Sequence, residues 1–182
     1  MMTRPSRRSV LKSAVSVAAG AVAGGRFAVS ATTPAEAALP TIPLGPHRVS
    51  RLIIGSNPFN GFCYSIPSLS AHMKEWFTPA KIAETLGAAR ANGINTWQWS
   101  YYPSSQAGLK LFRDQGGQIQ FMVLSGGVMK ENLGLIPDVA KSGPIAIVHH
   151  GGVTDERFRA GQMDKVRDYL KAIRDSGVLV GL

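Results

Sequence analysis

The residues best suited to chemistry stand where a short apolar run ends. The run 144–148 leads into His149 and His150, and two glycines follow. Imidazole titrates near neutral pH, so either histidine is a candidate for proton transfer or for metal ligation. Because side chains alternate along a strand, the two rings point to opposite faces, and only one of them enters a given pocket. We therefore predict His149 or His150 as the catalytic group and keep both as candidate metal ligands.

Amide, hydroxyl and aromatic side chains follow the other apolar runs, and they suit a small sugar-like ligand. Aromatic rings stack on the apolar faces of sugars, and amides form hydrogen bonds with their hydroxyl groups. The candidates for substrate binding are Asn57, Phe59, Gln98, Trp99, Tyr101 and Ser125. The alternative is that the aromatic residues, together with Trp97, are core side chains packed against helices.

Apolar runs and amphipathic segments alternate along the chain, which predicts βα units and a parallel sheet. We expect strands at 49–54, 94–99, 119–124, 145–148 and 178–182, and helices at about 78–93, 105–115, 132–142 and 161–175. Residues 57–77 are expected to form a long loop, which in compact domains is often functional. The carboxyl ends of parallel strands meet at one edge of the sheet, so the candidate residues should converge there.

The expected architecture is a partial (β/α)8 TIM barrel over residues 49–182, with about four and a half βα units. No Gly-x-Gly-x-x-Gly turn follows the first expected strand, which argues against an open nucleotide-binding sheet. A whole barrel takes about 250 residues, so we expect either a truncated fragment or a half-barrel that closes by self-association.

The first 37 residues have the parts of a twin-arginine signal peptide in order. Arg7 and Arg8 precede Val10, Leu11 and Lys12, where the bacterial pattern has Phe in the place of valine. A weakly apolar run follows, and the Ala-x-Ala motif at 35–37 predicts cleavage after Ala37. We expect export to the periplasm or the medium by the Tat translocase, without a permanent membrane span. The alternative is a basic tail that binds nucleic acid or a membrane surface.

Residues 38–48 are rich in proline and predict a linker or a strand that plugs one end of the domain. The formal net charge is +9, but five of the 20 cations belong to the predicted signal peptide. The other cations are scattered along the chain, so nucleic-acid binding is not expected. Cys63 is the only cysteine, which excludes an intrachain disulfide. No activating partner for this thiol is identifiable, so we expect a plain thiol rather than a nucleophile.

Three segments, 49–55, 89–96 and 147–150, are similar to the N-terminal half of aldo-keto reductase-like TIM barrels, and 170–177 resembles the helix before that family's fifth strand. The resemblance implies a site with an Asp and a Tyr after strand two, a Lys ending strand three and a His ending strand four, with NADPH. The histidine matches His149, whereas Gln98 and Ser125 occupy the Asp and Lys positions. Tyr101 or Tyr102 lies near the position of the family tyrosine.

A tyrosine acid of that kind needs a nearby cation to lower its pKa and a carboxylate partner, and Gln98 and Ser125 carry neither charge. Ordinary NADPH-dependent carbonyl reduction is therefore not expected, and the cofactor stays unknown. The leading hypothesis is an exported aldo-keto reductase-like protein with a diverged site for a small carbonyl or sugar-like compound. Two alternatives remain: a metal-dependent sugar isomerase, epimerase or hydrolase on a similar barrel, which would use a divalent metal, and a non-catalytic binding module or fragment.

Overall fold

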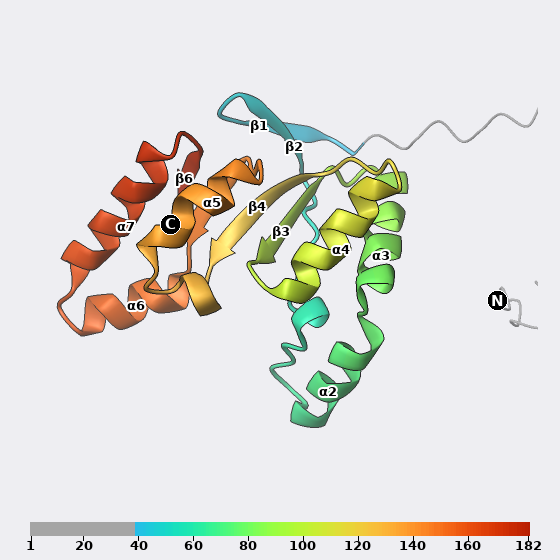
Figure 1. Ribbon diagram of the computed structural model, residues 1–182, viewed down its shortest axis with the longest axis horizontal. Helices are drawn as coiled ribbons and strands as arrows, with labels where there is room; N and C mark the ends of the chain where they lie inside the picture. Colours follow the sequence, from blue (N-terminus) through green and yellow to red (C-terminus); the bar gives the residue numbers. More distant parts are fainter. Residues whose placement is uncertain (1–38) are drawn as a thin grey trace, which may run out of the picture. The chain divides into compact units, whose positions relative to one another are not determined.

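The computed structural model describes residues 39–182 (Figure 1). The strands are β1 Thr41–Leu44, β2 His47–Ser50, β3 Thr96–Ser100, β4 Gln120–Ser125, β5 Ala146–His149 and β6 Leu179–Gly181. The α-helices are α2 Pro67–Trp76, α3 Pro79–Ala91, α4 Pro103–Asp114, α5 Ile136–Lys141, α6 Gly151–Arg159 and α7 Met163–Asp175. Three 3-10 turns are η1 Pro58–Asn60, η2 Gly127–Met129 and η3 Leu133–Leu135. The predicted signal peptide and its cleavage site lie outside the described residues.

A four-stranded parallel sheet organises this part of the chain and confirms the predicted α/β class. Its strands follow one another in sequence order, β3-β4-β5-β6, and each neighbouring pair is parallel. Ser125 at the end of β4 lies opposite His149 at the end of β5. The ends of the strands therefore do meet at one edge, as the alternating pattern predicts.

The prediction of a first strand at 49–54 is wrong over most of that range. Val49 and Ser50 instead end an antiparallel hairpin, β1–β2, within which Val49 pairs with Ile42. The Ser50 hydroxyl then donates to the Leu52 carbonyl at 2.6 Å, which bends the backbone out of the extended conformation. Only Ile54 returns to the sheet, as an isolated parallel bridge to β3. The segment 38–48, predicted as a linker or as a strand that plugs one end of the domain, thus contains strand β1 of this hairpin.

Two helices were not predicted. Helix α2 lies inside the predicted loop 57–77, and it buries none of its residues, so its apolar pattern gives no clear stripe. Helix α6 begins directly after His150 and precedes the helix that was predicted at 161–175. The other predicted helices correspond to α3, α4, α5 and α7. The Thr78 hydroxyl caps α3 by accepting from the Lys81 backbone N–H, and Gly93 follows the helix with a φ of 80°.

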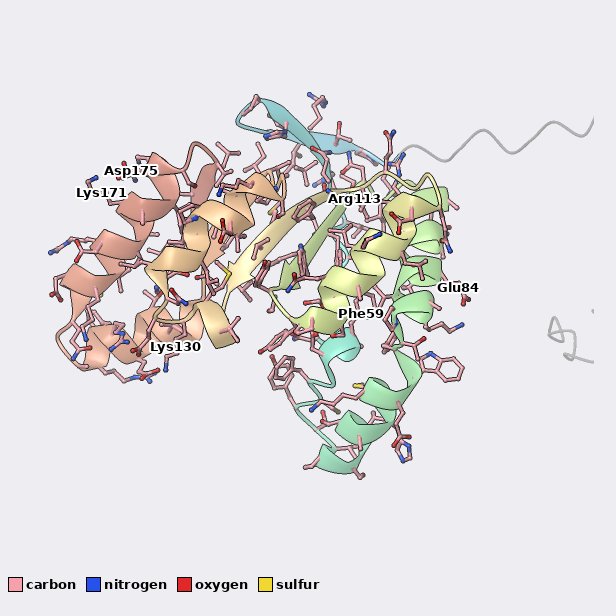
Figure 2. All side chains as sticks on the ribbon, viewed as in Figure 1. Phe59, Glu84, Arg113, Lys130, Lys171 and Asp175 are labelled. Carbon is pink, nitrogen blue, oxygen red and sulfur yellow. The ribbon has the colours of Figure 1, made fainter. Side chains whose placement is uncertain are left out.

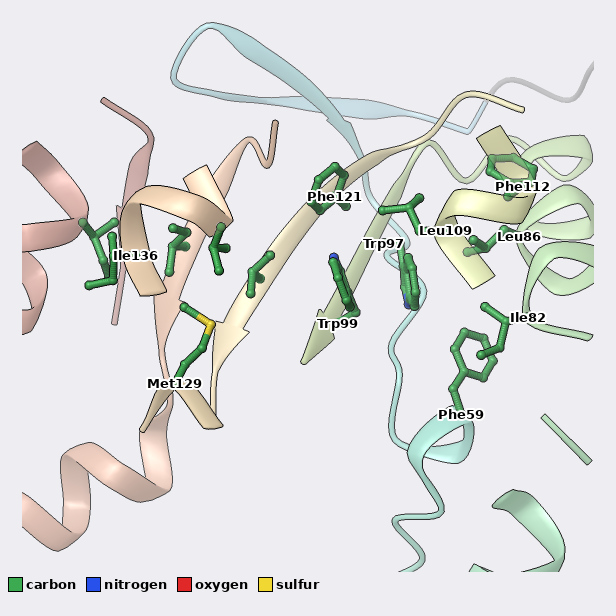
Figure 3. Close-up of a cluster of buried hydrophobic side chains, with 14 of the residues drawn as sticks. Phe59, Ile82, Leu86, Trp97, Trp99, Leu109, Phe112, Phe121, Met129 and Ile136 are labelled. Carbon is green, nitrogen blue, oxygen red and sulfur yellow. The ribbon is translucent and has the colours of Figure 1, made fainter. Parts of the chain in front are cut away.

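One face of the sheet packs against the helices and forms the main core (Figure 3). Trp97, Phe121 and Ile147 from three successive strands share this face and are at most 1% exposed. The helices contribute apolar side chains from α3, α4, α5 and α7: Ile82, Leu86, Leu109, Phe112, Ile136, Val139, Tyr169 and Ile173. Period-2 alternation therefore assigns the odd-numbered residues of these strands to the helix layer.

The opposite face of the sheet carries the even-numbered residues of β3, β4 and β5, together with Leu179 of β6, and is covered only in part. Val49 of the hairpin forms a small second cluster with Met122 and Ala146, and Leu179 packs against it. Leu124 and Val148, nearer the carboxyl ends of the strands, are partly exposed. The hairpin therefore covers the amino-terminal part of this face. None of the helices in the described part of the chain is long and apolar enough to cross a membrane.

Two glycines within helices test this packing. A Cβ on Gly108 of α4 would meet Ile82 of α3 at 2.5 Å, whereas a Cβ on Gly87 would meet nothing within 4 Å. We expect Gly108→Ala to destabilise the fold by about 1–3 kcal/mol through overpacking. The matched change Gly87→Ala should stabilise it by about 0.5–1 kcal/mol, because alanine favours the helix. Urea unfolding of both variants measures the difference, and equal effects would contradict the packing described.

Candidate functional site

His149 ends strand β5 and lies on the helix-facing side of the sheet. The residue is 3% exposed, and its ring meets the ring of Tyr169 edge-on, with centroids 5.1 Å apart. This position follows from alternation, because His149 shares a face with Ile147. His149 therefore lies between the strand ends and α7.

His150 has a different role, which is to start helix α6. Its Nδ1 accepts a hydrogen bond from the Gly152 backbone N–H at 3.1 Å, as an N-cap side chain does. Its carbonyl accepts from the backbone N–H groups of Val153 and Thr154. A Cβ on Gly126 would lie 2.9 Å from the His150 ring, so glycine at that position gives the ring its space. The two histidines thus point to different surroundings, as predicted from a strand.

A polar pocket of about 210 Å³ opens beside His149. Its lining comes from the segment after β4, from the end of β5, and from α6 and α7: Lys130, Glu131, Leu133, His149, Arg157, Lys165, Asp168 and Tyr169. Lys130, which is labelled in Figure 2, forms an ion pair with Glu156 at 2.7 Å, and this pair joins the β4–α5 segment to α6. Arg157 pairs with Glu131 and donates to Gln162 at 2.5 Å. Charges of both signs therefore surround the imidazole.

The imidazole of His149 is held at one nitrogen and free at the other. Its Nδ1 lies 2.7 Å from the hydroxyl oxygen of Thr154. Within residues 39–182, Nε2 has no hydrogen-bond partner, and it is not among the polar atoms that are sealed from solvent without one. Because His149 lines the pocket, Nε2 is the ring atom available to a ligand.

Burial lowers the pKa of His149 from its ordinary 6.5, and the nearby His150 and Arg157 charges lower it further. Desolvation acts in this way because it penalises the charged imidazolium. The pKa of Tyr169 is raised by burial, an effect that the neighbouring Ser125 hydroxyl partly offsets. Both side chains are therefore neutral at pH 7.

Ser125 and Tyr169 complete the buried polar surroundings of the histidine. The Tyr169 hydroxyl donates to the Met129 carbonyl at 2.7 Å and so ties α7 to the segment after β4. Ser125 is 1% exposed, and its Oγ has no well-formed hydrogen bond to any described group. Ser125 is thus close to His149, as predicted, but it faces the interior rather than the pocket.

The other predicted substrate-binding residues do not gather at this pocket. Phe59 and Trp99 are 5% and 2% exposed and belong to the core, where Trp99 stacks on Trp97 at 5.2 Å. Tyr101 is half-buried, with its ring 5.9 Å from that of Trp99. Such buried rings leave little surface for stacking on a sugar.

Asn57 and Gln98 are also separate from the pocket. The Asn57 side chain is exposed and donates to the Tyr64 hydroxyl at 3.1 Å. Gln98 lies between Trp97 and Trp99 in sequence and so occupies the opposite face of the sheet. Cys63 is a partly exposed free thiol.

Sequence reasoning missed Thr154, which contacts His149, and it missed Arg157 and Lys130, which line the pocket. Helix α6 was not predicted, and a lone cation or threonine carries no signal of its own. Tyr169 lies in the predicted helix 161–175 but was not among the predicted site residues. Between residues 39 and 182, no group of three His, Cys, Asp or Glu side chains lies close enough to hold a metal ion. Comparisons with protein-family models, with curated proteins and with solved structures gave no match.

The pKa of His149 leads to an expected pH dependence of stability. The folded-state pKa lies below 6.5, so the unfolded chain binds more protons in acid, and stability is lost as the pH falls from about 6.5 through the folded pKa. We expect the unfolding temperature to fall between pH 7.5 and 5.5. His149→Asn, whose amide still reaches Thr154, should lose part of that dependence.

The exposed His72 on α2 supplies the control, because its side chain is 76% exposed. His72→Asn should retain the dependence of the unmodified protein. The cationic side chains that line the pocket beside His149, Arg157, Lys130 and Lys165, are the same in both variants. An identical dependence in all three proteins would contradict a buried, neutral His149.

Proposed function

We propose that this chain is an exported aldo-keto reductase-like protein with a diverged site, and that its sheet is part of a (β/α)8 barrel. Two features of the fold support the barrel. The parallel strands follow in sequence order without the reversal that marks a doubly wound sheet. The helices α3, α4, α5 and α7 also join one core on one face of the sheet. In a barrel, the other face would line the interior.

The activity we propose is the binding and conversion of a small carbonyl or sugar-like compound at the carboxyl ends of the strands. One observation carries this proposal: the imidazole of His149 is held by Thr154 at Nδ1, and His149 lines a pocket among charged side chains. Barrel enzymes place their reacting groups at this end of the strands. The pocket volume of about 210 Å³ is roughly that of seven water molecules, which suits three- or four-carbon compounds.

The cofactor stays unassigned in this proposal. Gln98 and Ser125 stand where the resemblance implies a carboxylate and a lysine, and Gln98 lies on the other face of the sheet from His149. Without those charges, NADPH-dependent reduction has no support from these positions. His149 and His150 remain the candidate ligands if a divalent metal takes part.

Ligand binding at the pocket is tested with glyceraldehyde, dihydroxyacetone and erythritol. Calorimetry measures the affinity of each compound, and nitrogen-15 NMR records the signals of the histidine rings. We expect saturable binding that shifts the His149 signals. His149→Phe should weaken it at least tenfold, which corresponds to the loss of about 1.4 kcal/mol from a hydrogen bond. His72→Phe, at an exposed site on another helix, should bind normally. Binding that survives His149→Phe unchanged would place the site elsewhere.

Export is tested by fusing residues 1–37 to a reporter protein that folds before transport. The twin-arginine pair is the recognised part of such signals, so Arg7→Lys with Arg8→Lys should keep the reporter in the cytoplasm. The matched control, Arg26→Lys, keeps the charge and lies outside the pair. Cell fractionation measures the distribution. Equal export of all three fusions would rule out the twin-arginine route.

A further inference from the structure

The hydroxyl of Thr154 has two polar neighbours, and both contacts bear on which ring nitrogen of His149 carries the proton. The hydroxyl oxygen lies 2.7 Å from His149 Nδ1 and 3.3 Å from the His150 carbonyl oxygen. A carbonyl oxygen only accepts hydrogen bonds, and a threonine hydroxyl has one proton to donate. The carbonyl is also four residues before Thr154, the usual partner of a threonine side chain inside a helix.

Both contacts are hydrogen bonds in only one arrangement. The Thr154 hydroxyl donates to the His150 carbonyl, and its oxygen accepts from an N–H at His149 Nδ1. In the reverse arrangement, the threonine proton goes to Nδ1, and oxygen lone pairs face each other at 3.3 Å. A neutral imidazole has one proton, so protonation at Nδ1 leaves a lone pair on Nε2.

We propose that His149 presents an unprotonated Nε2 to the pocket and that the site recognises a hydroxyl group of its ligand, with Thr154 as the positioning residue. This inference rests on the proposed function and narrows its substrate class to hydroxyl-bearing compounds, such as short polyols and hydroxy-ketones. A lone pair accepts from a hydroxyl, but it repels the oxygen of a plain carbonyl. The ketone oxygen of such a ligand is therefore not the atom that meets His149.

The surroundings of the pocket agree with a neutral, hydroxylated ligand. Two of its cations are already paired, Lys130 with Glu156 and Arg157 with Glu131. Lys165 and Asp168 supply one further charge of each sign at the exposed edge of α7. Hydroxyl groups both donate and accept, so they match a lining of mixed sign better than an anion does.

The protonation of His149 is tested directly by nitrogen-15 NMR of the ring in the ligand-free, full-length protein. Long-range proton–nitrogen correlations distinguish a ring with its proton on Nδ1 from one with its proton on Nε2. We expect the Nδ1 form in the unmodified protein and in Thr154→Ser, which keeps the hydroxyl. Thr154→Val has the same shape without the hydroxyl and should lose that preference. The amide spectrum of each variant reports whether the fold is intact. A ring protonated on Nε2 in the unmodified protein would overturn the inference.

The ligand class is tested with small probes of similar size that either carry a hydroxyl group or lack one. Hydroxyacetone and butane-1,2-diol are compared with butanone, and calorimetry measures each affinity. We expect the hydroxylated probes to bind roughly tenfold more tightly, because only they donate to Nε2. Thr154→Val should reduce that preference and Thr154→Ser should keep it. Equal binding of both kinds overturns the hydroxyl preference alone. If no probe binds, the proposed function fails and this inference fails with it.

Discussion

The packing of one face of the parallel sheet against its helices determines where every polar residue at the strand ends lies. Trp97, Phe121 and Ile147 commit the odd-numbered positions of three strands to that layer. Ser125 and His149 also stand at odd-numbered positions, so their side chains point toward the helices rather than to the opposite face. A polar residue in this position is desolvated and needs partners. The site beside α7 exists because His149 lies on the same face of β5 as the core residue Ile147.

Burial has two consequences for that histidine. It favours the neutral ring, because the charged form would lose its hydration. Burial also means that an unpaired Nδ1 would destabilise the fold, and Thr154 of helix α6 supplies a hydrogen-bond partner for it. Helix α6 begins where His150 caps it, so the second histidine indirectly positions the partner of the first. Two adjacent residues thus serve the same pocket from different directions.

The two faces of the sheet divide the predicted site. Gln98 lies on the face of the sheet that points away from the helix layer. The β1–β2 hairpin covers only the amino-terminal part of that face, where Val49 packs near Met122 and Ala146. The aromatic residues expected to bind sugar instead fill the core, where Trp99 packs against Trp97 and Phe121. Large aromatic side chains stabilise most when they are buried, which explains this outcome. The candidate pocket is therefore built mainly from charged and hydroxyl side chains of the segment after β4 and of helices α6 and α7.

Local pattern alone determined the α/β class, the strands β3 to β6 and the helices α3, α4, α5 and α7, because period-2 and 3.6-residue repeats arise from the backbone itself. It also showed that His149 and His150 face apart. The tertiary structure decided which of the two faces the helices cover, that residues 41–50 form a hairpin, and that Thr154, Arg157 and Lys130 meet at His149. Those outcomes depend on contacts between segments far apart in the chain, and the sequence near each residue contains no record of its distant neighbours.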